Sequence, residues 1–197
     1  MSQYFDNDNN IKHNKKIIEF YFNDKKYNLY SDNGVFSKDK FDYGTRLLLD
    51  SIDISKLSGN VLDLGCGIGV VGIILGTINE NINIDMVDIN ERAISLVRDN
   101  LTLNKVKANV FSSDVYSNVN KKYDYIITNP PIRAGKEVVR KFLFGGYDYL
   151  NDNGMLYFVM RKDHGVKSMI KELESKYNVT IVNKDKGFYI VSLTKHL

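Results

Sequence analysis

The chain has 197 residues, of which 43% are hydrophobic and 26% charged, and its formal net charge is +3 at pH 7. This composition is typical of one globular domain with a sizeable core, and no apolar run approaches the roughly 18 residues of a membrane span. The single cysteine excludes an internal disulfide, and the three histidines are too scattered for a metal site. We therefore expect a cytoplasmic protein without a metal.

The first part of the chain is expected to add a small β-hairpin and a helix to the main domain. Residues 1–14 are polar and rich in asparagine, which predicts a disordered N-terminus. Two β-like runs at 17–22 and 26–30 flank a short polar turn and predict the hairpin. Thr45 is the expected N-cap of the helix that follows, so the extension covers residues 15–57.

After residue 58 the chain alternates between strand-like and helix-like segments. Strands are expected at 60–64, 82–87, 108–111, 123–128, 154–160, 178–183 and 187–194, and helices at 69–78, 91–103, 135–150 and 165–177. This alternation predicts an α/β fold with a Rossmann-like, doubly wound, seven-stranded sheet that is mostly parallel. The linker between the last two strands is too short for a crossover helix, so they must form an antiparallel C-terminal hairpin. Residues 58–197 are expected to form this main domain.

The most informative stretch joins the first of these strands to the first of these helices. Its alternating glycines, Gly65, Gly67 and Gly69, allow positive φ angles and the close approach of a ligand. The N–H groups at the start of the following helix are free to bind a polar group. The run from Gly67 to Gly72 also matches the dinucleotide pattern G-x-G-x-x-G, which by itself is weak evidence for NAD.

Three acidic residues follow three successive strands and favour a different class of cofactor. Asp63 lies two positions before the first glycine, where its carboxylate repels a pyrophosphate but suits a cationic amine. Asp88 ends the second strand, where an acid accepts hydrogen bonds from ribose hydroxyls. Asp114 follows the third strand, within reach of an adenine amino group. Together the three acids fit an adenosine that carries an amino-acid tail.

The stretch Asp63-Leu-Gly-Cys-Gly-Ile-Gly69, with the later acids and the closing hairpin, resembles the class I S-adenosylmethionine-dependent methyltransferases. This resemblance covers residues 30–197 and implies S-adenosyl-L-methionine as the cofactor. The positions that it assigns to cofactor binding are Asp63, Gly65, Cys66, Gly67, Gly69, Asp88, Ile89, Asp114, Val115 and Asn129. Cys66 is interpreted as a small loop residue and not as a nucleophile, because no basic residue flanks it.

A second informative stretch, Asn129-Pro130-Pro131, follows the fourth strand. Open α/β sheets bind ligands at this carboxyl edge, and the two prolines stiffen the chain and remove two N–H donors. The Asn129 side-chain oxygen and the Pro130 carbonyl then form an acceptor-rich ledge that suits an NH₂ group. A planar amino nitrogen is a poor nucleophile, and holding both hydrogens lets it pyramidalise toward a sulfonium methyl. Positioning and charge stabilisation carry such an in-line displacement.

This ledge resembles the N-P-P-[Tyr/Phe/Trp] signature of enzymes that methylate adenine N6, guanine N2 or a protein glutamine. Ile132 replaces the aromatic residue, and this departure disfavours the adenine and glutamine acceptors. The segment from Asn129 to Lys136 is similar to the ribosomal RNA small-subunit methyltransferase C-like group, whose members methylate guanine N2. The resemblance implies that Asn129, Pro130, Pro131 and Ile132 form the catalytic ledge.

Aromatic and basic residues are expected around this ledge, where RNA would bind. Segments 32–37 and 42–45 match the same enzyme group. The residues expected at the rim are Phe36, Tyr43, Arg133, Lys136 and Arg140. The two aromatic residues can supply the missing stacking surface, and the three basic residues are expected to meet RNA phosphates. They open a final third of the chain in which basic residues outnumber acidic ones.

The sequence therefore predicts methyl transfer from S-adenosylmethionine to an exocyclic amino nitrogen in RNA, with guanine N2 of small-subunit ribosomal RNA as the favoured acceptor. The expected partner is ribosomal RNA or a ribosomal subunit, with no membrane involved. Three alternatives stay open: an adenine N6 or protein glutamine acceptor, a non-catalytic RNA-binding module with this fold, and an NAD-dependent oxidoreductase. The target nucleotide and the oligomeric state are left undetermined.

Overall fold

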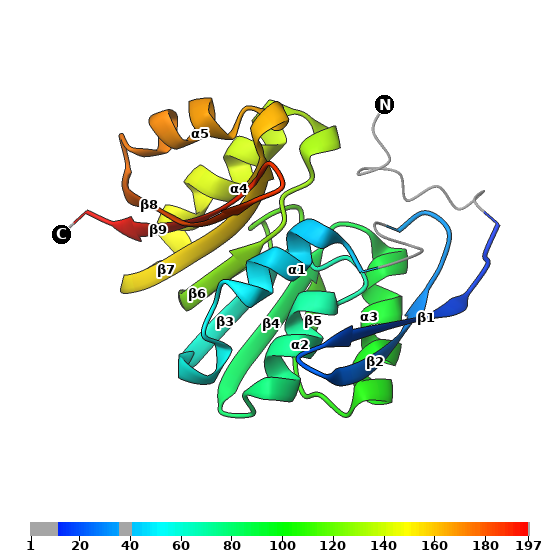
Figure 1. Cartoon of the computed structure of the whole chain (residues 1–197). Helices are drawn as coiled ribbons and strands as arrows, with labels where there is room; N and C mark the ends of the chain where they lie inside the picture. Colours follow the sequence, from blue (N-terminus) through cyan, green and yellow to red (C-terminus); the bar gives the residue numbers. More distant parts are fainter. Residues whose placement is uncertain (1–11, 36–40, 197) are drawn as a thin grey trace.

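The computed structural model describes residues 12–35 and 41–196 (Figure 1). Its strands and α-helices, in chain order, are β1 (Lys16–Phe22), β2 (Lys25–Ser31), α1 (Tyr43–Asp50), β3 (Gly59–Leu64), α2 (Val70–Ile78), β4 (Ile82–Asp88), α3 (Glu91–Asn104), β5 (Asn109–Ser112), β6 (Tyr123–Thr128), α4 (Lys136–Tyr149), β7 (Leu150–Arg161), α5 (Val166–Leu173), β8 (Tyr177–Asp185) and β9 (Phe188–Lys195). No helix in these ranges is long and apolar enough to cross a membrane.

Seven of the strands form one sheet in the order β5-β4-β3-β6-β7-β9-β8, and β1 and β2 form a separate hairpin. Strands β3 to β7 run parallel to one another, whereas β9 pairs antiparallel with both β7 and β8. The predicted doubly wound sheet with an antiparallel C-terminal hairpin is therefore confirmed. The β7 strand begins at Leu150, earlier than predicted, because the chain passes from α4 into β7 without a loop.

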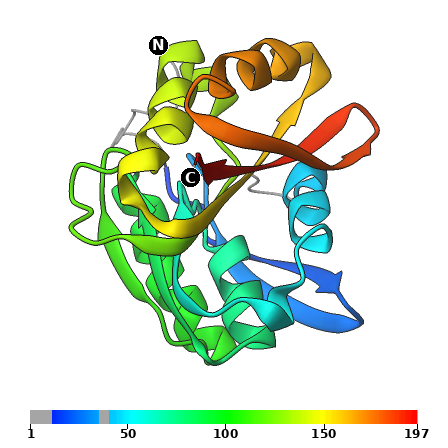
Figure 2. The same ribbon diagram turned by 90° about the vertical axis from the view of Figure 1, so that its left-hand side faces the viewer.

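Alternate side chains of the sheet divide between two hydrophobic cores. Val61 and Ile127 face the core formed with α1, α2 and α3, whereas Leu62 and Ile126 face the core formed with α4 and α5. This division follows from the two-residue period of a strand, and burial on both faces explains the nearly continuous apolar runs of β3 and β6. The two groups of helices lie on opposite faces of the sheet in Figures 1 and 2.

The β1–β2 hairpin packs against α3 and shares the first core with the main sheet. Asn100 on α3 is fully buried and connects the two parts. Its side chain accepts a hydrogen bond from the Tyr30 N–H at 2.6 Å and donates to the Tyr30 and Ile68 carbonyls, each at 2.9 Å. One amide thus ties the hairpin to the glycine turn. Most of the segment predicted to be disordered, 1–14, lies outside the described residues.

The N-terminus of α1 differs from the sequence prediction. Thr45 is not the N-cap, because α1 begins at Tyr43 and is capped by Asp42. The Asp42 carboxylate accepts hydrogen bonds from the Thr45 N–H at 2.8 Å and from the Thr45 hydroxyl at 3.1 Å. Aspartate is a stronger N-cap than threonine because its carboxylate carries charge toward the positive end of the helix. Thr45 therefore lies in the first turn.

Asn100→Ala should lower the free energy of unfolding by about 2–4 kcal/mol, because it leaves buried backbone groups of Tyr30 and Ile68 without partners. Denaturant unfolding of the purified protein measures this change. Thr102→Ala on the same helix is the matched control, because its exposed hydroxyl donates to the Arg98 carbonyl within α3, and it should cost no more than about 0.5 kcal/mol. Equal effects of the two substitutions would contradict the role of Asn100.

Candidate functional site

The candidate site lies where the winding of the sheet reverses. Strands β3 and β6 are adjacent and parallel, with Asp63 opposite Ile127. The sheet continues from β3 to β4 on one side and from β6 to β7 on the other. Open α/β sheets bind ligands at the carboxyl ends of the strands beside such a reversal. The glycine turn after β3 and the Asn129 segment after β6 are therefore at the same edge of the sheet.

The glycine turn adopts a backbone shape that few other residues allow. Gly65, Gly67 and Gly69 have φ angles of 70°, 54° and 93°. The N–H groups of Gly65 and Cys66 both donate to the Val87 carbonyl at 2.9 Å, which holds the turn against the end of β4. A Cβ atom built on Gly67 meets no atom within 4 Å, so a ligand has room there. Cys66 is buried, and burial raises the pKa of its thiol, which agrees with a packing role.

Asp63 is a buried carboxyl group beside this turn, with only 2% of its surface exposed. Its Oδ2 atom accepts a hydrogen bond from the Gly72 N–H, in the first turn of α2, at 2.9 Å. Burial raises the pKa of Asp63 to about 7, and the nearby charge of Asp88 adds to the rise. A cation placed beside Asp63 would favour its ionised form. A cationic amine bound beside the turn would therefore stabilise the ionised carboxylate of Asp63.

Asp88 connects the glycine turn to the start of α3. Its two carboxylate oxygens accept hydrogen bonds from the N–H groups of Gly67 at 2.8 Å and Asn90 at 2.9 Å. Burial raises the pKa of Asp88, and these two hydrogen bonds oppose the rise. Each oxygen keeps a lone pair for a further donor. Ile89 is half-buried between Asp88 and Asn90, so the end of β4 also presents an apolar side chain.

Asp114 and Val115 form a tight turn after β5. Asp114 is exposed, whereas Val115 is buried and has a φ of 53°, an unusual conformation for a β-branched residue. The Ser113 hydroxyl donates to the Val115 carbonyl at 2.9 Å and accepts from the Asn118 N–H at 3.1 Å. These bonds hold the turn in its strained shape and leave the Asp114 carboxylate exposed at the third strand end.

Asn129 follows β6 and contacts the N-terminus of α1. Its Nδ2 atom donates to the Asp42 Oδ2 atom at 3.1 Å and to the Thr45 Oγ1 atom at 2.9 Å. Its side-chain oxygen makes no hydrogen bond to any residue that the structure describes. Because the amide group is planar, this oxygen is directed away from the atoms that hold the nitrogen. It is therefore available as an acceptor at the edge of the sheet.

The residues after Asn129 turn toward the other face of the sheet. Pro130 is buried and Pro131 half-buried, and Ile132 begins a short 3₁₀ turn that ends at Ala134. The Ile132 side chain packs against the core formed with α4 and α5. The Asn129 nitrogen instead faces α1 on the opposite side. Ile132, which replaces the usual aromatic residue, is thus partly buried in the core.

Two aromatic rings lie near the Asn129 side of the site. The rings of Tyr43 and Phe188 are 5.6 Å apart, and the Tyr43 hydroxyl donates to Asp185. The Lys186 ammonium lies 4.7 Å from the centre of the Tyr43 ring. Tyr43 therefore belongs to a cluster that joins α1 to the β8–β9 hairpin. The other predicted aromatic, Phe36, lies outside the described residues.

The predicted basic rim is partly neutralised. Glu172 on α5 forms ion pairs with Lys136, at 2.7 Å, and with Arg140. Arg133 is exposed and makes no hydrogen bond or ion pair with the part of the chain that the structure describes. Among the three basic residues expected to contact phosphates, Arg133 can therefore meet an anion without first breaking an ion pair.

Three site residues were not predicted in these positions. Asp42 matched the upstream motif without an assigned role, and the signal that could have identified it as an N-cap is its residue type directly before the helix. Phe188 and Glu172 gave no sequence signal, because their partners are distant in the chain. Such contacts follow from the packing of whole elements and not from local spacing.

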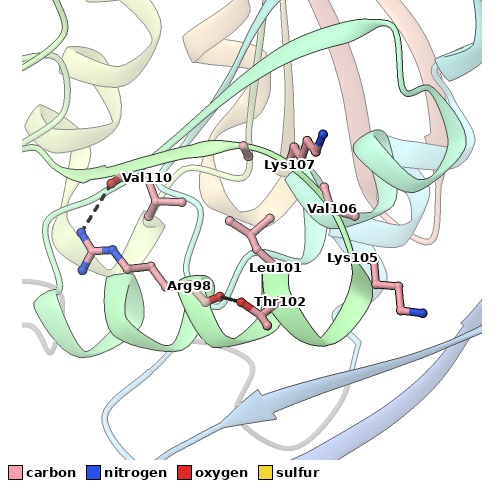
Figure 3. Close-up of a pocket in the computed structure, with 8 residues that line it drawn as sticks. Arg98, Leu101, Thr102, Lys105, Val106, Lys107 and Val110 are labelled. Atoms are coloured by element: carbon pink, nitrogen blue, oxygen red, sulfur yellow. Dashed lines mark hydrogen bonds between the residues drawn. The ribbon is translucent and has the colours of Figure 1, made fainter.

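A surface pocket of about 590 Å³ lies elsewhere, between the end of α3 and the edge strand β5 (Figure 3). Its lining residues are Arg98, Leu101, Thr102, Lys105, Val106, Lys107, Ala108 and Val110. Arg98 reaches the Val110 carbonyl at 3.5 Å, which is a long contact. None of the predicted site residues lines this pocket.

The model of the methyltransferase small domain family matches residues 26–192. The uncharacterized protein YbxB of Bacillus subtilis is 38% identical over 196 residues, which is 98% of each chain. The ribosomal RNA small subunit methyltransferase C of Aliivibrio fischeri is 48% identical over 102 residues, or 52% of this chain and 30% of the relative. The chain spans less than half the length of the methyltransferases C that it matches.

A solved structure shares the fold. The 16S rRNA N2 guanosine methyltransferase of T. thermophilus, in complex with AdoMet and guanosine, has a TM-score of 0.84 and 23% sequence identity to this chain. The match covers 92% of this chain and 51% of that one. At this level of identity the match supports the architecture, which agrees with the strand order described above.

The pKa of Asp63 predicts a specific pH-dependent contribution to stability. The folded pKa of about 7 lies above the ordinary value of 3.8, so the folded state binds the proton more tightly between these pH values. The contribution of Asp63 to the free energy of unfolding should therefore be fully present below pH ~4 and be lost as the pH rises to about 7. Asp63→Asn should remove this component, which is on the order of 2–4 kcal/mol. Urea unfolding at several pH values measures it.

Asp114→Asn is the matched control for that measurement, because Asp114 is exposed at a neighbouring strand end. Asp114→Asn should keep the Asp63-dependent fall in the free energy of unfolding between pH ~4 and ~7. If Asp63→Asn also leaves the pH dependence unchanged, the buried carboxyl of Asp63 does not have the electrostatic role described here.

Proposed function

The chain belongs to the methyltransferase small domain family, and from this premise we propose that it methylates the exocyclic N2 nitrogen of guanine in small-subunit ribosomal RNA. It is an S-adenosylmethionine-dependent methyltransferase, and S-adenosylmethionine is its cofactor. The observation that carries the acceptor proposal is the Asn129 amide, whose nitrogen is held by α1 and whose oxygen is available at the sheet edge. An RNA substrate of this kind places the enzyme in the cytoplasm.

We propose that the cofactor lies along the carboxyl ends of β3, β4 and β5. When bound, S-adenosylmethionine supplies an electrophilic methyl group on its sulfonium. Asp63 attracts the cationic amine of the amino-acid tail, and Asp88 accepts hydrogen bonds from the ribose hydroxyls. Asp114 is exposed where it can accept from the adenine amino group. The remaining proposed contacts, from the turn and the strand ends, are Gly65, Cys66, Gly67, Gly69, Ile89 and Val115.

The catalytic ledge acts on the acceptor nitrogen. The lone pair of an exocyclic amine is delocalised into its ring, so the free amine attacks a methyl group slowly. The Asn129 side-chain oxygen and the Pro130 carbonyl accept its two hydrogens and hold them out of the ring plane, which returns electron density to the nitrogen. The same two oxygens would stabilise the positive charge that the nitrogen gains when it accepts the methyl group. It then loses a proton to water.

Guanine is favoured over the other planar acceptors for two reasons. The relatives that match about half of this chain carry the name ribosomal RNA small subunit methyltransferase C. In addition, Ile132 packs partly into the core, so the stacking surface typical of adenine-specific ledges is absent at that position. The paired rings of Tyr43 and Phe188 offer an aromatic surface on the Asn129 side instead. An adenine N6 or protein glutamine acceptor is the second candidate.

Asn129→Ala should abolish methyl transfer while leaving cofactor affinity unchanged within about twofold, because it removes an acceptor that acts on the substrate amine. Transfer of a radiolabelled methyl group to small-subunit ribosomal RNA measures the activity, and calorimetry with S-adenosylhomocysteine measures the affinity. Asn151→Ala at the opposite end of the sheet is the control and should retain activity, since the Asn151 side chain donates to Asp124 and lies away from the proposed ledge. Normal turnover by Asn129→Ala would exclude the proposed ledge.

The charge of Arg133 should appear in the salt dependence of RNA binding. Arg133→Ala should weaken binding and reduce the slope of log affinity against log salt concentration by about 1, as expected for one lost phosphate contact. Lys136→Ala should have a smaller effect, because Glu172 already neutralises part of that charge. Lys56→Ala, far from the carboxyl edge of the sheet, is the control. An unchanged slope for Arg133→Ala would contradict a phosphate contact.

A further inference from the structure

We propose that Asp42 and Thr45, at the start of α1, are positioning residues that fix the orientation of the Asn129 amide for methyl transfer. This inference rests on the proposed function, in which the Asn129 oxygen accepts a hydrogen from the substrate amine. An asparagine amide can rotate by 180° and exchange its oxygen and nitrogen with little change in shape. The wrong orientation presents an NH₂ group to the substrate NH₂ group, so the two donors face each other and the acceptor is lost.

The hydrogen bonds around Asn129 permit only one orientation. The Asp42 Oδ2 atom accepts from the Thr45 N–H at 2.8 Å, from the Thr45 hydroxyl at 3.1 Å and from the Asn129 Nδ2 atom at 3.1 Å. A hydroxyl group has a single hydrogen, and Thr45 gives it to Asp42. The Thr45 Oγ1 atom therefore faces Asn129 at 2.9 Å as an acceptor. Both neighbours of the amide are acceptors, so its NH₂ group must face them.

The surroundings of α1 make this arrangement rigid. Leu47, Leu48 and Leu49 are buried, which fixes α1 against the sheet. Gly44, between the two positioning residues, leaves no spare room, since a Cβ atom there would lie 2.9 Å from the Phe188 ring. The two acceptors are thus held by packing on the scaffold and do not depend on a bound substrate. Asp42 has two separate tasks, because it caps α1 and also orients Asn129.

Substitutions at position 42 separate these two tasks. Serine is a good N-cap but is one atom shorter than aspartate, so Asp42→Ser keeps the cap of α1 and loses the contact with Asn129. Asparagine is also a good N-cap and has an oxygen at the same reach, so Asp42→Asn keeps both. We expect Asp42→Ser to lower kcat by about 10–100-fold, the cost typical of losing a group that orients a reactive one. Asp42→Asn should recover at least about tenfold of that loss.

Several readouts distinguish positioning from support of the fold. The melting temperature and the affinity for S-adenosylhomocysteine should be the same in the Ser and Asn variants, so that the difference lies in kcat alone. Thr45→Val is the second test, because it removes the hydroxyl acceptor but leaves the backbone N–H that Asp42 caps. It should also lower kcat without changing cofactor affinity. Asp53→Ser, at an exposed aspartate that does not contact Asn129, is the matched control.

Hydrogen exchange of the Asn129 side-chain amide, followed by NMR in the same protein, tests the orientation of the amide directly. In the unmodified protein its NH₂ hydrogens should exchange slowly with solvent, and in Asp42→Ser the exchange should be at least about tenfold faster, because one of the two anchoring hydrogen bonds is lost. If the Ser and Thr45→Val variants keep normal kcat and slow exchange, the positioning role is wrong. If exchange behaves as expected but the unmodified enzyme methylates no RNA, the proposed function fails and the orientation of Asn129 stands.

Discussion

The parallel pairing of β3 with β6 is the constraint on which the candidate site depends. It places the two chemically informative turns, Asp63 to Gly69 and Asn129 to Ile132, at one edge of the sheet although they are distant in the chain. The first turn offers one carboxylate and an open backbone, and the second offers acceptors stiffened by proline. Because the winding reverses between these strands, α2 and α4, which follow them, pack on opposite faces of the sheet, and a cofactor and an acceptor can meet between the two strand ends.

Asp63, Asp88 and Asn129 share one arrangement, in which part of each side chain is hydrogen-bonded to the scaffold and part remains available. Asp63 uses one oxygen to hold α2, and Asp88 accepts from the glycine turn and from the start of α3. The Asn129 side-chain nitrogen donates a hydrogen bond to Asp42, the N-cap of α1. Each side chain is thus oriented before any ligand binds, which is the condition for electrostatic catalysis without reorganisation. The arrangement requires burial of the Asp63 carboxyl group, and this burial disfavours its ionised form and raises its pKa to about 7.

Local patterns in the sequence predicted the architecture, and contacts between distant elements could not be predicted. Apolar periodicity and the short linker before Phe188 were enough to predict the sheet and its closing hairpin, because strand spacing and loop length limit the topology. The spacing of the glycines after β3, and of the acids after successive strands, was enough to predict that they lie at strand ends. The start of α1 was misplaced, because Thr45 and Asp42 are both good caps by type. The Glu172 ion pairs depend on the packing of α5 against α4, and the Asn129 contacts depend on the position of α1 beside the loop after β6. Neither arrangement leaves a pattern in the chain.

The proposal on which the mechanism depends is that the available oxygen of Asn129 accepts from the exocyclic amine of a guanine in RNA. The most direct measurement incubates the enzyme with small-subunit ribosomal RNA and isotopically labelled S-adenosylmethionine, then identifies the labelled nucleoside by mass spectrometry after complete digestion. We expect the label in N2-methylguanosine. Label in N6-methyladenosine, label on a ring nitrogen or ribose oxygen, or no label in RNA under conditions in which the cofactor binds would contradict the proposed acceptor.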